Sequence, residues 1–279
     1  MISPRIALSA YTTLGVGGPV GRFIEATSDD ELVAAVRGAD RDGDPVLVLG
    51  GGSNLVVADD GFPGTVIRVA TKGVRVGDHS GPNGSGPDGA RSLAVTAAAG
   101  ETWDHLVERA VAERLSGIEC LAGIPGLAGA TPIQNVGAYG QDVAQTIVAV
   151  RAFDRRGDEV ITLSSADCGF GYRTSMLKRA AAGLATGRYI VLDVTFRLGW
   201  PSASEPVLSA PIQYPELADT LGVAQGDQVP LEQARDAVLE LRRSKGMVLD
   251  PADPDTRSAG SFFTNPVLTA GQFAEVKTG

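Results

Sequence analysis

Hydrophobic positions along the chain follow two different periods, and these predict a mixture of strands and helices. An uninterrupted apolar run such as Val46–Leu49 is typical of a buried strand. Within residues 101–115, apolar side chains return every three or four positions, which is the period of a helix with one buried face. The two kinds of element do not alternate regularly, which favours an α+β fold over a doubly wound sheet. Strands are expected at 46–49, 55–58, 65–70, 93–99, 147–153, 159–163 and 189–198, and further helices after Ser28 and at 231–245.

Turn and cap signals mark where some of these elements begin and end. Ser28, followed three positions later by Glu31, has the spacing of a capping box and predicts the start of a short helix. Asp154–Asp158 separates two expected strands and predicts a hairpin. Residues 78–91 are rich in Gly, Pro, Ser and Asn, and they predict a second hairpin tip.

Composition and charge narrow the classes of function. The 279 residues are enough for two or more domains. The net charge of −9 argues against a nucleic-acid or anionic-membrane partner, because phosphate binding needs clustered Lys and Arg. No apolar run has membrane-spanning length, and the two cysteines and two histidines form no ligand cluster, so no catalytic metal is expected. We therefore expect a cytoplasmic monomer with reduced cysteines.

The first glycine-rich segment, Gly50–Asn54, lies between two expected strands. Consecutive glycines allow several backbone N–H groups to point at one anion, and Ser53 and Asn54 add side-chain donors. This chemistry suits a pyrophosphate, although a simple tight turn explains the same residues. Neither a dinucleotide-binding Rossmann fingerprint nor a P-loop fits the segment, because the third glycine and the Lys-Ser/Thr pair are absent.

The second glycine-rich segment, Gly123–Gly140, has five glycines and two prolines but few polar residues. Such a segment makes a poor solvated loop. It makes a good wall against a flat, mostly apolar ring, with Gln134, Asn135 and backbone groups available to the edge of the ring. A buried glycine-rich crossover is the alternative.

Five motifs, taken in order along the chain, resemble those of the UDP-N-acetylenolpyruvoylglucosamine reductase family. The first has Thr12 where asparagine is commoner in the family. The resemblance implies a two-lobed FAD-binding fold, with lobes at 1–70 and 71–245 and a partial substrate domain at 246–279. The motifs are Tyr11–Gly15, Gly50–Leu55, Gly123–Gly140, Phe170–Ser175 and Ala259–Pro266.

The resemblance also implies where the cofactor binds. The first glycine-rich segment corresponds to the family's pyrophosphate loop, the second to its flavin-binding stretch, and Arg242 to an arginine on the flavin side. NADPH is implied as the second cofactor, which gives hydride to FAD. The implied FAD contacts are Gly50, Gly51, Gly52, Ser53, Asn54, Leu55, Ile124, Pro125, Gly126, Gly129, Ala130, Thr131, Gln134, Asn135, Gly137, Ala138, Tyr139 and Arg242.

The implied reaction has two steps and needs two catalytic groups. NADPH reduces FAD and leaves, and the reduced flavin passes hydride to UDP-N-acetylglucosamine enolpyruvate, whose neighbouring carbon takes a proton. Negative charge develops beside the substrate carboxylate, so a fixed cation and a proton donor are needed. Arg173 matches the cation and Ser261 the proton donor. Without the resemblance, Arg173 reads as a surface arginine paired with Asp167, and Ser261 as a cap or turn residue.

Four further residues match family positions at the UDP-sugar. Lys245 suits a diphosphate, Asn265 and Tyr214 suit phosphate or sugar oxygens, and Tyr172 lies beside the catalytic arginine. Each has a simpler alternative: Lys245 as a lysine at a helix C-terminus, Asn265 as part of an Asn-Pro turn, and the tyrosines as aromatic residues in loops. Pro215 stands where the family usually has glycine, so the match of Tyr214 is the weakest.

One departure concerns the end of the chain. The family continues past the segment that ends here at Gly279, and its continuation carries a catalytic glutamate that Glu275 does not match. We expect a fragment of a longer enzyme that binds flavin but fails as a reductase. Two other functions stay open: a non-catalytic flavin-binding remnant, and an FAD-dependent oxidase of the wider flavin-binding superfamily. Such oxidases often tether flavin through histidine, but neither His79 nor His105 lies in either of the two expected flavin-binding segments, Gly50–Asn54 and Gly123–Gly140.

Overall fold

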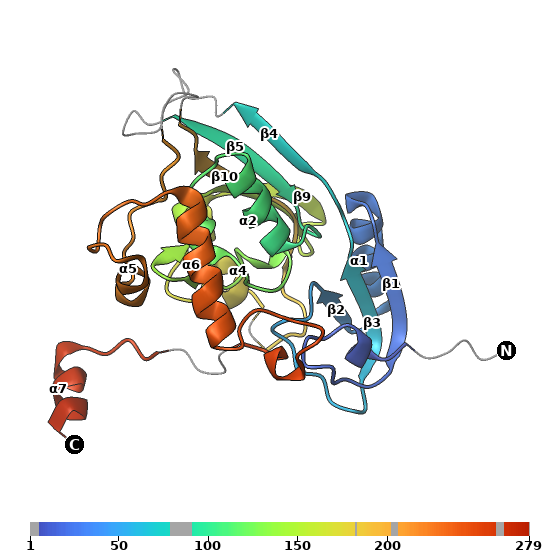
Figure 1. Ribbon diagram of the computed structural model, residues 1–279. Helices are drawn as coiled ribbons and strands as arrows, with labels where there is room; N and C mark the ends of the chain where they lie inside the picture. Colours follow the sequence, from blue (N-terminus) through green and yellow to red (C-terminus); the bar gives the residue numbers. More distant parts are fainter. Residues whose placement is uncertain (1–5, 79–90, 182, 202–205, 261–264, 279) are drawn as a thin grey trace.

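Two sheets carry the core of the protein (Figure 1). The computed structural model describes residues 6–78, 91–181, 183–201, 206–260 and 265–278. The smaller sheet has three strands in the order β1-β3-β2, and the larger has five in the order β4-β5-β10-β8-β9. The strands are β1 Val20–Ala26, β2 Val46–Leu49, β3 Phe62–Val69, β4 Val74–Asp78, β5 Ser92–Ala98, β6 Gly137–Ala138, β7 Gln141–Asp142, β8 Ile147–Asp154, β9 Glu159–Ser164 and β10 Tyr189–Gly199.

The helices are divided between the two sheets. Helices α2 and α6 lie over one face of the larger sheet, α1 lies beside the smaller one, and α7 stands apart from both (Figure 1). The α-helices are α1 Asp29–Asp42, α2 Trp103–Ala112, α3 Ser165–Cys168, α4 Met176–Arg179, α5 Pro215–Leu221, α6 Leu231–Ser244 and α7 Ala270–Thr278. Single 3₁₀ turns are η1 Leu8–Ala10, η2 Glu119–Leu121, η3 Ala128–Ala130, η4 Val143–Gln145 and η5 Pro254–Thr256.

The smaller sheet is parallel, and α1 returns the chain between β1 and β2. Ser28 caps α1, because its Oγ accepts the backbone N–H of Glu31 at 3.2 Å. The Glu31 carboxylate accepts the N–H of Thr27 at 2.8 Å. Gly43, with φ of 72°, ends the helix in the left-handed conformation that glycine allows. The predicted helix start is confirmed, and the helix is longer than the cap signal alone indicates.

The larger sheet is antiparallel and packs against α2. Trp103 is fully buried with its ring centroid 5.7 Å from that of Phe196 in β10. Its indole N–H donates to the Leu121 carbonyl at 3.0 Å, so a large aromatic is buried with its polar atom satisfied. Strands β8 and β9 pair antiparallel across the turn that Asp154–Asp158 predicts. Leu115 is buried as expected, but it lies beyond the end of α2.

The α+β class is confirmed, and one expected strand is wrong. Residues 55–58 join no sheet. Val56 is 56% exposed, whereas the apolar neighbours on either side of it pack into a small cluster around Leu8. The prediction fails because a loop whose side chains pack against the core has the same run of apolar residues as a short strand. Residues 79–90 of the expected hairpin tip lie outside the described residues, and the flanking β4 and β5 are antiparallel.

Ion pairs join α1 to the hairpin formed by β8 and β9. Arg151 of β8 contacts Asp29 in the first turn of α1. Arg37 of α1 contacts Asp158 in the hairpin turn at 2.5 Å. These pairs connect the helix of the smaller sheet to an edge of the larger sheet.

Arg155 makes a third and more buried connection. Its Nε donates to the Asp40 carboxylate at 2.9 Å, and its Nη1 donates to the carbonyl oxygens of Thr186 and Gly187 at 3.0 Å each. The side chain is only 20% exposed. A planar guanidinium can satisfy three acceptors at once, which a lysine could not do with the same geometry.

Arg155→Met is therefore expected to lower the free energy of unfolding by about 2–3 kcal/mol. Hydrogen bonds to charged groups contribute about 1.5–3 kcal/mol each, and the partial exposure of this group reduces their sum. Urea unfolding of the apoprotein, followed by circular dichroism, measures the change. Arg41→Met is the matched control, because Arg41 is 80% exposed and should change stability by less than about 0.5 kcal/mol. Equal losses in both variants would contradict the role of Arg155.

Candidate functional site

The two glycine-rich segments lie against each other in the structure. A Cβ atom built on Gly51 would stand 2.8 Å from Cα of Gly126, so the backbones meet at a distance that only glycine permits. The Ser53 hydroxyl donates to the Pro125 carbonyl at 3.3 Å. The two segments therefore form one surface, although they are far apart in the sequence.

The first segment is a tight loop that directly follows β2. Gly52 has φ of 64°, and a Cβ there would lie 1.9 Å from the Tyr11 carbonyl oxygen. The N–H of Thr13 donates to the Gly52 carbonyl at 3.1 Å. The residues around Tyr11 thus pack against one side of the loop at Gly52, while Gly51 and Asn54 stay exposed to solvent. Exposed loop amides of this kind can bind an anion.

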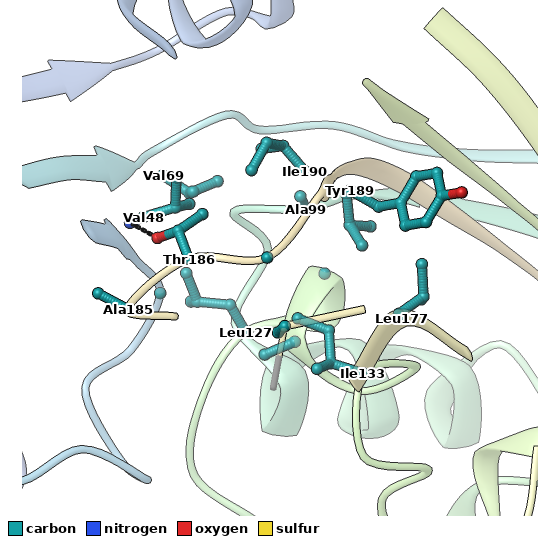
Figure 2. Close-up of a pocket in the computed structure, with 16 residues that line it drawn as sticks. Val48, Val69, Ala99, Leu127, Ile133, Leu177, Ala185, Thr186, Tyr189 and Ile190 are labelled. Carbon is teal, nitrogen blue, oxygen red and sulfur yellow. Dashed lines mark hydrogen bonds between the residues drawn. The ribbon is translucent and has the colours of Figure 1, made fainter. Parts of the chain in front are cut away.

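An apolar cavity of about 220 Å³ lies between the two sheets (Figure 2). It is bounded by Val48 and Val69 of the smaller sheet and by Ile190 of β10. The Val48 N–H donates to the Thr186 hydroxyl at 2.7 Å, which ties the two sides of the cavity together. An apolar cavity beside a loop with exposed residues Gly51 and Asn54 suits a ligand that combines phosphates with flat rings. Both glycine-rich segments contribute to its wall, through Gly50, Leu127, Gly129, Ala130 and Ile133.

The cavity also contains residues that no sequence motif indicates. Thr186 and Gly187 lie in the loop before β10, and the tertiary fold brings them to the cavity from a part of the sequence that has no recognisable motif. Arg155 holds the carbonyl groups of both residues. The arginine that joins the two sheets thus also fixes part of the cavity wall.

Arg242 lies buried against the start of the second glycine-rich segment. It is 9% exposed, and one of its terminal nitrogens donates to the Met247 carbonyl at 2.9 Å. Among the residues that the structure describes, its Nε has no hydrogen-bond partner, and it lies 3.2 Å from a Cβ built on Gly123. Burial lowers the pKa of Arg242, and the nearby Tyr139 and Asp104 oppose that shift. A buried guanidinium N–H without a partner is a donor available to a ligand.

Three of the expected residues gather at the edge of this surface. The rings of Tyr139 and Tyr214 meet edge to face with centroids 5.4 Å apart, and Lys245 Nζ lies 5.8 Å from the Tyr139 ring. Both Glu216 oxygens contact Lys245 Nζ at 2.7 Å, and this hydrogen bond raises the pKa of Lys245. Burial raises the pKa of Tyr139. Pro215 begins α5 and directs the helix so that Glu216 faces the lysine.

Arg173 lies in a tight turn between Gly171 and Thr174, whose backbones exchange hydrogen bonds at 3.0 and 3.2 Å. Its φ is 53°, an unusual value for a residue with a side chain. Asp167, the alternative partner considered from the sequence, closes a capping box with Ser164. Within the described ranges no ion pair joins Asp167 to Arg173, so that interpretation is wrong. The neighbouring Tyr172 is 55% exposed.

The comparisons with known proteins agree with this geometry. A family model described as "FAD binding domain" matches residues 20–163. The UDP-N-acetylenolpyruvoylglucosamine reductase of Thermobifida fusca is 58% identical over 97% of this chain and 70% of its own length. The chain belongs to the UDP-N-acetylenolpyruvoylglucosamine reductase family. The enzyme of that name from Streptomyces coelicolor is 52% identical over 97% of this chain and 65% of its own length.

A solved structure supports the same family membership. The UDP-N-acetylenolpyruvylglucosamine reductase (MurB) of Thermus caldophilus aligns with a TM-score of 0.58 and 28% identity, over 98% of this chain and 79% of that one. The recognition of the family and the prediction of FAD as cofactor are confirmed, and the protein is an FAD-dependent oxidoreductase. Across the described residues, no helix is long and apolar enough to cross a membrane, and no cluster of acidic, His or Cys side chains could hold a metal ion.

Not every residue expected from the reductase family is brought to this surface. Ser261 lies outside the described residues. Asn265 is exposed on the segment that leads to α7, which stands apart from the two sheets (Figure 1). Asn54 and Gln134, both expected at the flavin, bond to each other at 3.2 Å. Their roles, like those of the other expected contacts, stay predictions.

Proposed function

We propose that the protein reduces UDP-N-acetylglucosamine enolpyruvate to UDP-N-acetylmuramate, a precursor of peptidoglycan, with NADPH as reductant. The observation that carries the proposal is the 58% identity to a UDP-N-acetylenolpyruvoylglucosamine reductase along nearly the whole chain. Three observations support it: the two glycine-rich segments contact each other, both of them line the apolar cavity, and Lys245 lies over Tyr139 of the second segment. The cytoplasm, where NADPH is available, is the proposed location.

The residues around the cavity fit FAD. The Gly50–Asn54 loop would hold the pyrophosphate through its backbone amides, and Arg242 would donate its free Nε–H to the cofactor. Gly126 and Gly129 let the second segment pack closely against the protein that surrounds the cavity, because a Cβ there would lie 3.0 Å from Ser53 Oγ and 2.4 Å from Ala99 Cβ. When bound, FAD supplies the hydride acceptor and donor that link the two halves of the reaction.

In this proposal, Arg173 binds the substrate carboxylate and stabilises the negative charge that develops beside it. A guanidinium stays charged at all relevant pH values and can hold a carboxylate through two parallel hydrogen bonds. Lys245 and Tyr214 would contact the UDP diphosphate or sugar, with Tyr172 and Asn265 as further contacts. Ser261 would donate the proton. We place the flavin lobes at 1–70 and 71–245, and the beginning of a substrate domain at 246–279.

Rapid-mixing kinetics test the proposal. The purified protein should be yellow, and acid or heat should release FAD, because the binding is non-covalent. NADPH should bleach the flavin under anaerobic conditions, and the enolpyruvyl sugar should then restore its colour in the full-length protein. Flavin that is never reoxidised by the sugar would reject the proposed substrate. Flavin that stays with the denatured chain would instead favour a covalent flavin oxidase.

A further inference from the structure

Asn135 is buried, and both ends of its side-chain amide bond to the protein backbone. It is 5% exposed and has φ of 48°, which asparagine tolerates better than most residues. Its Nδ2 donates to the Gly171 carbonyl at 3.1 Å, and its Oδ1 accepts the Ala144 N–H at 3.1 Å. The protein itself therefore engages both ends of the amide.

Ser175 makes a second connection between the same two segments. It is fully buried, and its Oγ donates to the Ile133 carbonyl. The same oxygen accepts the Lys178 N–H at 3.2 Å and so caps α4. The Arg173 turn is thus tied to the second glycine-rich segment at both ends, through Gly171 and through Ser175.

The backbone of Arg173 shows why the turn needs such support. Its left-handed φ of 53° is unfavourable for a long side chain, and it persists only where the surroundings enforce it. Lys178 Nζ also donates to the Arg173 carbonyl at 3.0 Å. These contacts hold the backbone from which the guanidinium projects.

We propose that Asn135 and Ser175 are positioning residues, which fix the direction of Arg173 relative to the flavin-binding segment. The inference rests on the proposed function, in which Arg173 stabilises charge on the substrate. Asn135 then acts through the turn, in place of the direct flavin contact that the family motif indicates. The second glycine-rich segment lines the cavity and also bonds to the Arg173 turn, so these two hydrogen-bonded connections would fix where the guanidinium projects relative to the cofactor.

The test uses Asn135→Asp, Asn135→Gly and Ser175→Ala in the full-length holoprotein. The aspartate keeps the size of the side chain but cannot donate to Gly171 when ionised, and the glycine tolerates the positive φ without any amide. In rapid mixing, each variant should reoxidise reduced flavin with the enolpyruvyl sugar about tenfold more slowly, since displacing a reacting group by 1 Å can cost up to about 10²-fold. Reduction by NADPH and the affinity for FAD should stay within about twofold of the parent protein.

Ser164→Ala is the matched control, because Ser164 caps the neighbouring α3 without bonding to the Arg173 turn. It should leave both half-reactions unchanged. Arg173→Ala should slow reoxidation more than the Asn135 variants, and adding Asn135→Gly to it should cause little further loss. Weaker FAD binding with normal reoxidation would overturn the inference and make Asn135 a flavin contact. Equal slowing by Ser164→Ala would also overturn it, as a general stability effect. Absence of reoxidation in the parent protein would reject the proposed function itself.

Discussion

Gly51→Val is expected to weaken FAD binding by about 10²-fold. A Cβ at position 51 would stand 2.8 Å from Cα of Gly126, and backbone atoms cannot move aside as a flexible side chain can. Overpacking costs about 1–3 kcal/mol, and each 1.4 kcal/mol is a tenfold change in affinity. The two glycine-rich segments would separate, so the Gly50–Asn54 loop, which is proposed to hold the pyrophosphate, would lose its alignment with the cavity. Titration of the apoprotein with FAD, followed by flavin fluorescence, measures the effect.

Gly38→Ala is the control for this substitution. Gly38 lies in α1, and a Cβ there would meet nothing within 4 Å. Alanine should stabilise the helix by about 0.5–1 kcal/mol and leave the affinity for FAD unchanged. If Gly51→Val bound FAD as tightly as Gly38→Ala, the contact between the two segments would not matter for the cofactor.

Ser261→Ala is expected to separate the two half-reactions. Hydride transfer from NADPH to FAD needs no proton from Ser261, so bleaching of the flavin should keep its normal rate. Reoxidation by the enolpyruvyl sugar should slow by about 10²–10⁴-fold, which is the contribution of a positioned proton donor. Single-turnover rapid mixing of the full-length protein measures both steps.

The nearby Ser258→Ala serves as its control. Ser258 is exposed, and its hydroxyl accepts the Gly260 N–H at 3.4 Å, so its loss should affect neither step. Equal slowing of both half-reactions by Ser261→Ala would mean that this serine supports the structure and does not deliver the proton.

Local signals in the sequence predict much of the fold because they arise from short-range physics. The Ser28 cap, the helical period of residues 101–115 and the turn at Asp154–Asp158 depend on neighbours within a few positions. Residues 55–58 show the limit of such signals. Leu55 and Val57 pack against the cluster around Leu8 while Val56 stays exposed. A strand also needs the edge of a neighbouring strand, and that edge depends on the rest of the chain.

The candidate site was harder to predict, because several of its contacts join distant segments. Thr186 contributes to the cavity through its bond to Val48, and no motif surrounds it. Glu216 reaches Lys245 from the start of α5. The motif around Asn135 predicts a flavin contact, whereas in the structure the backbone groups of Gly171 and Ala144 bond to both ends of its amide.

The pairing of Lys245 with Glu216 has a consequence for the diphosphate of the sugar nucleotide that Lys245 is proposed to bind. Because the lysine already holds a carboxylate, an arriving phosphate exchanges one anion for another and does not neutralise a bare cation. Such an exchange yields less binding free energy, since the lost ion pair must be subtracted from the new one. The departing ligand likewise leaves no unpaired charge, because Glu216 can return to the lysine. In the proposed reaction, this internal anion would favour rapid exchange of the sugar nucleotide over its tight retention.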